Sequence, residues 1–271
     1  MRLFIAIAVS LTLMSCSSAP SGPEKGTPAF YWQAAKETFA AGDNMKALEH
    51  LDKLVGDKDY GAKALPWALV LASGMAAGYE DLADQYETGA RMNKADPAWF
   101  RRHVGAYRAV AKQLSLQFAD RYTKLGQSAA HAIPLAFGYP KGSATPSAQL
   151  TKVANGIALP DADVDLALSH TVQRGILMAA CRAAGAPDDP AKGESILKDP
   201  EAKVPHSTFS MAMANSLYSL SQIYTPLKAD EPEKLRIFCE RADEALKPVL
   251  DSKEKKVLAD KIEKSLKKKK T

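Results

Sequence analysis

Cysteine and histidine are scarce in this 271-residue chain, and no catalytic or metal-binding motif stands out. Its three cysteines and five histidines contain no Cys-x-x-Cys or His-x-x-x-His pair, which argues against a zinc site. The chain also lacks the Gly-x-Ser-x-Gly turn of serine hydrolases and the glycine-rich loops that cradle phosphate. We therefore expect no enzyme activity, no metal and no cofactor, and a function that rests on binding.

Apolar runs of membrane-spanning length are absent, even at the N-terminus. There, Arg2 precedes a mostly apolar stretch, residues 3–13, which ends at a small residue, Ser15. The stretch is shorter than the roughly 20 apolar residues that a membrane-spanning helix needs. Its order of charge, apolar core and small residue is typical of a secretory signal peptide, which we assign to residues 1–15.

The four residues Leu13-Met14-Ser15-Cys16 resemble the lipobox of bacterial lipoproteins, although Met14 stands where a small or aliphatic residue is usual. The resemblance implies that Cys16 carries the lipid, with acyl chains such as palmitate, and that it becomes the mature N-terminus. No Asp follows Cys16, which by the family's sorting habit implies the outer membrane, facing the periplasm. The alternative is an ordinary signal peptide cut near Ser15 or Ala19. Residues 16–27 read as a flexible tether.

The net charge of +5 is confined to the C-terminus. Residues 251–271 hold nine Lys and four Asp or Glu, whereas residues 16–250 hold 26 basic and 27 acidic residues. A nucleic-acid-binding protein usually carries its basic charge on a folded face. The sequence therefore predicts no nucleic-acid partner, and a basic helix or tail over residues 251–271 that either contacts anionic lipid or stays solvated.

Alanine is abundant, β-branched clusters are few, and no segment alternates as a half-buried strand does. We therefore expect an all-α protein. Apolar spacing of three and four residues predicts helices over residues 30–41, 45–55, 62–77 and 79–93. In this interpretation Gly42 and Gly78 break the chain between the two helices of each pair.

Equivalent residues recur at an offset of 36: Tyr31 with Trp67, Gly42 with Gly78, and Ala47 with Ala83. This pattern resembles the tetratricopeptide repeat (TPR), although the leucine–glycine pair of that repeat is missing from both copies. The resemblance covers about residues 28–97. It implies antiparallel helical hairpins stacked as a TPR-like α-solenoid, which we extend over residues 28–137.

The richest concentration of turn-forming residues, at 138–147, predicts a linker loop, after which a second helical region spans residues 148–250. Cys181 and Cys239 fall on separate predicted helices of this region. In an oxidising envelope they either form a disulfide or remain two buried thiols.

Three aromatic residues of the repeat-like region, Tyr31, Trp67 and Tyr86, are candidates for lining a concave groove, the surface on which repeat proteins often bind. The alternative is that each packs between hairpins. The groove favours a lipid-anchored scaffold that binds an envelope protein.

The alternative function is an accessory component of a periplasmic solute transporter, which binds or channels a small apolar ligand. By overall type alone, the chain is similar to the helical, lipid-anchored T-component of TRAP transporters. That function implies a homo-oligomer.

Overall fold

The computed structural model describes residues 22–125 and 131–267, and within them it is mostly α-helical. Helices form where the predicted apolar spacing occurs, joined by short connections. The described elements are α1 (Pro28–Ala41), α2 (Asn44–Asp52), α3 (Gly61–Met92), α4 (Pro97–Leu125), β1 (Ala132–Pro134), α5 (Ala148–Ala154), α6 (Asp161–Ala183), α7 (Pro190–Leu197), β2 (Lys203–Pro205), α8 (His206–Ser221), the 3-10 helix η1 (Gln222–Tyr224), α9 (Pro232–Leu246) and α10 (Lys253–Lys267).

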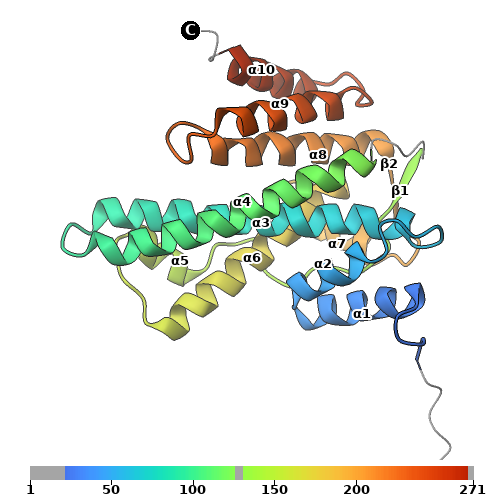
Figure 1. The fold of residues 1–271 in the computed structure, drawn as a ribbon, viewed down its shortest axis with the longest axis horizontal. Helices are drawn as coiled ribbons and strands as arrows, with labels where there is room; N and C mark the ends of the chain where they lie inside the picture. Colours follow the sequence, from blue (N-terminus) through green and yellow to red (C-terminus); the bar gives the residue numbers. More distant parts are fainter. Residues whose placement is uncertain (1–21, 126–130, 268–271) are drawn as a thin grey trace, which may run out of the picture.

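The long helix α3 is the centre of the fold, with α4 and α6 making the most extensive contacts along it (Figure 1). Helices α8, α9 and α10 lie one upon the next at one end of the molecule, and α1 lies at the other. Helices α1 and α2 pack as an antiparallel pair. The structure therefore has stacked helix pairs, but it does not identify a solenoid.

The first predicted hairpin is confirmed, and its turn has a clear local cause. Gly42 adopts φ 92°, a left-handed conformation that suits glycine, and its N–H donates to the Phe39 carbonyl oxygen over 3.0 Å. The side chain of Asp43 then caps α2, accepting from Lys46 N over 3.1 Å. Helix α1 thus ends at Ala41 and α2 begins at Asn44.

The predicted break at Gly78 is wrong, because α3 runs through it as one helix of 32 residues. Gly78 serves close packing instead: a Cβ placed there would lie 2.7 Å from Val172 Cα. Gly74, one turn earlier, would place its Cβ 2.5 Å from Ile176 Cα. The two glycines let the backbones of α3 and α6 approach, and the second copy of the predicted repeat is not a hairpin.

The prediction that no strand is present is also wrong. Within the described residues, β1 and β2 pair antiparallel, with Ile133 opposite Val204. Each strand has three residues, too few for an alternating pattern to stand out in the sequence. Residues 138–147 contain no helix or strand.

One large buried cluster joins the two predicted helical regions. It includes Trp67 and Leu71 of α3, Ile176 of α6 and Phe238 of α9. A smaller cluster surrounds Tyr86 where α3, α4, α5 and α6 meet. Residues 28–137 and 148–250 therefore share a core instead of each having its own.

No helix among residues 22–125 and 131–267 combines the length and the apolar character needed to cross a membrane.

Candidate functional site

The aromatic residues predicted to line a groove do not come together on an open surface. Trp67 is fully buried, and its indole N–H donates to the Leu135 carbonyl oxygen over 3.0 Å. Tyr86 is also fully buried, stacked on His103 with ring centroids 4.9 Å apart. Tyr31 is half-buried near His50. For Trp67 and Tyr86 the groove prediction is wrong, because the segment after β1 covers the first and α4 covers the second.

The two cysteines of the described residues are both free and buried. Cys181 on α6 faces Gly193 of α7, where an added Cβ would lie 2.6 Å from its sulfur. Cys239 on α9 lies 3.7 Å from Ser221 Oγ. The disulfide that the sequence left open is therefore not formed in this structure. Cys16, the predicted lipid-attachment residue, lies outside the described residues.

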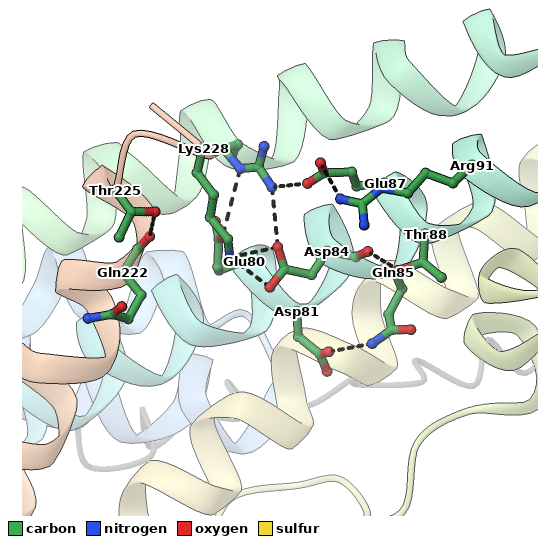
Figure 2. A network of polar contacts seen from close by, with 11 residues as sticks. Glu80, Asp81, Asp84, Gln85, Glu87, Thr88, Arg91, Gln222, Thr225 and Lys228 are labelled. Atoms are coloured by element: carbon green, nitrogen blue, oxygen red, sulfur yellow. Dashed lines mark hydrogen bonds and ion pairs between the residues drawn. The ribbon is translucent and has the colours of Figure 1, made fainter. Parts of the chain in front are cut away.

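A partly buried ion-pair network, which we call the Lys228 cluster, joins α3 to α4 and to the loop before α9 (Figure 2). Lys228 Nζ lies 2.6 Å from Glu80 Oε1 and 2.7 Å from Asp84 Oδ1. Arg108 of α4 reaches Asp84 over 3.2 Å and Glu87 over 3.0 Å. Each carboxylate of the cluster therefore lies beside a lysine or an arginine. These ion pairs act as a clamp, which means that they hold α3, α4 and the loop before α9 together.

The electrostatics of the Lys228 cluster fit this role. Burial raises the pKa of Glu80, against the opposing effect of Lys228. Burial alone would lower the pKa of Lys228, but its hydrogen bonds to Asp84 and Glu80 outweigh that effect and raise it. The ammonium group therefore stays charged, and it holds the loop that carries Leu227, a side chain 93% exposed.

A cavity of about 730 Å³, open to solvent, lies between the end of α6, the start of α8 and α10. We call it the α10 cleft. Leu250 and Val257 at the cleft are 78% and 46% exposed. Its lining mixes apolar, polar and charged side chains: Arg182, Gly185, Pro187, Asp188, Ser207, Thr208, Met211, Ala212, Asn215, Val249, Leu250, Ser252, Lys253, Glu254, Val257, Leu258 and Lys261.

A smaller crevice of about 260 Å³ lies on the other side of Arg182, between α3, α6 and α8. Several of its polar groups are already engaged: Arg174 Nη1 lies 3.0 Å from Asp81 Oδ2, and Arg174 Nε donates to the Ala144 carbonyl oxygen over 2.7 Å. The Thr171 hydroxyl donates to the Ala167 carbonyl oxygen. Besides Arg182, the crevice is also lined by the hydroxyl-bearing residues Ser216 and Ser219.

Sequence reasoning missed Arg182. Along α6, apolar residues recur at helical spacing through Val172, Ile176 and Ala179, and Arg182 follows three residues later on the same side. The signal available in the sequence was the position of Arg182, a charged residue on an otherwise apolar helix face. Its significance depends on α8 and α10, which are distant in sequence.

Among residues 22–125 and 131–267, no group of three or more His, Cys, Asp and Glu side chains is arranged to hold a metal ion. The fold and cleft define a mostly α protein of packed helices with an open, amphipathic cleft. No family model, no curated protein and no solved structure matches this chain.

Proposed function

We propose that this protein is a lipid-anchored envelope protein that acts as a scaffold, binding a segment of a partner polypeptide in the α10 cleft. The observation that carries the proposal is the cleft itself, open to solvent with Leu250 and Val257 uncovered. Apolar side chains in such a position become buried when a partner binds, which is the main favourable contribution to association. The absence of an unpaired carboxylate in the Lys228 cluster supports binding over catalysis.

The anchoring part of the proposal rests on the lipobox resemblance at Cys16, which implies the outer membrane and the periplasm. The TPR resemblance is supported where α1 and α2 form a hairpin around Gly42. Lipid at Cys16 predicts that Cys16→Ala moves the protein from the membrane fraction to the soluble fraction. Mature material without acyl groups by mass spectrometry would contradict the anchor.

The scaffold proposal is tested by placing a photo-crosslinking residue at Leu250 or at Val257 in cells. A matched control carries the same residue at Leu227, which is more exposed but lies outside the cleft. We expect a defined adduct from the two cleft positions and none from Leu227. Equal adducts from all three positions, or none from the cleft, would overturn the proposal.

A second candidate is the solute-transport accessory role, with a small apolar ligand in the same cleft. It is favoured by the cleft volume of about 730 Å³, which lies within the ordinary range of small-molecule sites. Under this role, mass spectrometry of the native protein from envelopes shows a bound small molecule, and Leu250 gives no protein adduct. This role also predicts a homo-oligomer.

A further inference from the structure

Arg182 differs from the arginines that join elements elsewhere in the fold. Arg121 binds Asp52 through two contacts, 2.7 Å from Nε to Oδ1 and 2.5 Å from Nη2 to Oδ2. Arg108 and Arg174 are likewise ion-paired. Within the described part of the chain, the Arg182 guanidinium makes no hydrogen bond and no ion pair, and the residue is half-buried. Arg108, Arg121 and Arg174 each have a carboxylate partner, and among the described residues Arg182 has none.

The environment of Arg182 raises the free-energy cost of its lone charge. Burial lowers the pKa of Arg182, and the charge of Asp188 opposes this shift without forming an ion pair. A partly desolvated guanidinium gains most from an anion that it can bind directly. Its planar fork of N–H donors matches the two oxygens of a carboxylate.

The start of α8 adds to the attraction for an anion. Its N-cap is Pro205, and no side chain caps the first turn, which contributes Ser207 and Thr208 to the cleft lining. The N-terminus of a helix carries a partial positive charge. The positive charge of Arg182 and the partial positive charge at the start of α8 therefore lie at the border of the same cavity.

We propose that Arg182 binds the α-carboxylate of a partner polypeptide, so that the segment held in the α10 cleft is a C-terminal one. This inference rests on the proposed scaffold function and names the chemistry of its partner. Arg182 lines both the cleft and the crevice behind it. Since the crevice has a volume of only about 260 Å³, a bound chain ends at Arg182 and leaves through the open side.

The rest of the lining suits the last residues of a polypeptide. Met211 and Leu258 offer an apolar wall for the final side chain, and Asn215 offers an amide for backbone groups. Leu250 and Val257 then cover residues further from the terminus. A free amphipathic carboxylate shares part of this chemistry, and the experiment below separates it from a polypeptide end.

The test compares two randomised hexapeptide libraries that differ only at the C-terminus, one ending in a free carboxylate and the other in a carboxamide. The full mature protein is used in detergent, as wild type, Arg182→Gln and Arg102→Gln. Arg102 is an exposed arginine of α4 and serves as the matched control. We expect wild type and Arg102→Gln to enrich free-acid peptides about tenfold over amides, and Arg182→Gln to lose this preference.

A second pair of variants keeps the inference testable if Arg182→Gln fails to fold. Val257 is 46% exposed, so both Val257→Glu and Val257→Lys leave the core intact. We expect Val257→Glu to weaken binding of free-acid peptides several-fold and Val257→Lys to keep it, because only the first adds negative charge to the cleft that the carboxylate enters. Equal weakening by both variants would contradict the inference.

The outcomes separate this inference from the proposed function. If Leu250 still crosslinks a protein but acid and amide peptides bind equally, the carboxylate inference fails and the scaffold remains. If neither peptides nor crosslinks are found, both fail. Binding of decanoate, used as a free-carboxylate probe, without binding of any peptide overturns the polypeptide terminus in favour of a small ligand.

Discussion

Lys228 Nζ lies 2.6 Å from Glu80 Oε1, although the two residues are 148 positions apart in the sequence. This contact, with that to Asp84, fixes the loop before α9 to the middle of α3 (Figure 2). Glu80 is only 12% exposed and its second oxygen has no hydrogen-bond partner. The stability of the loop before α9 therefore depends on the charges of Glu80 and Asp84 in α3.

Removal of the Lys228 ammonium group leaves the mostly buried Glu80 carboxylate without its nearest cation. We expect Lys228→Met to lower the free energy of unfolding by about 1–3 kcal/mol, the cost of leaving a desolvated polar group without its partner. Urea denaturation measures the change. The control is Lys198→Met, which removes a 62% exposed lysine paired with Glu194 and costs about 0.5 kcal/mol or less. Similar losses in both variants would show that the Lys228 cluster is not a clamp.

The pH dependence of the same pair follows from the raised pKa of Lys228. The stabilising contribution of a lysine with a raised folded-state pKa is complete below its ordinary value of 10.5 and is lost as the pH rises through the raised pKa. The stability difference between wild type and Lys228→Met should therefore be constant from pH 8 to 10 and shrink above pH 10.5. Urea titrations at each pH measure it, and a difference that grows with pH would contradict the assignment.

The crossing of α3 and α6 predicts opposite effects for two glycine-to-alanine changes. In Gly78→Ala the new methyl group meets Val172 Cα at 2.7 Å and the Thr171 carbonyl oxygen at 2.9 Å, so we expect a loss of about 1–3 kcal/mol. At Gly105, within α4, an added Cβ has nothing within 4 Å. There we expect a gain of about 0.5–1 kcal/mol from helix propensity. Thermal and urea unfolding test both, and a stabilised Gly78→Ala would rule out the tight crossing.

The two buried thiols predict a simple chemical result. In a Cys16→Ser variant, Cys181 and Cys239 should resist a water-soluble thiol reagent while folded, because burial raises the pKa of both thiols and limits access. Both should react after denaturation without reductant. If thiols are detected only when a reductant is added, the chain contains a disulfide that this structure lacks.

Gly42 and Gly78 illustrate how far the sequence predicts this fold. Both follow an apolar helix, and the same signal predicted a turn at each, correctly at Gly42 and wrongly at Gly78. The difference lies in the neighbours: the left-handed backbone of Gly42 is a local property, whereas Gly78 is in contact with a helix about 90 residues away. Local signals therefore predicted where helices form, but not whether a glycine ends one or packs against another.

The candidate site was less predictable for the same reason. Trp67 and Tyr86 were reasonable groove residues in a repeat-like sequence, yet long-range packing places both in the interior. Arg182 became notable only once α8 and α10 were seen to border it. Residue type indicated which side chains are able to bind, and tertiary contacts determined which ones remain free to do so.

The placement of α1 and α10 at opposite ends of the molecule has a consequence for access (Figure 1). If Cys16 is acylated, the tether joins the body on the α1 side, so the α10 cleft lies at the end of the molecule away from the attachment. A flexible tether lets the body turn, so its length sets how far from the lipid headgroups the cleft can reach.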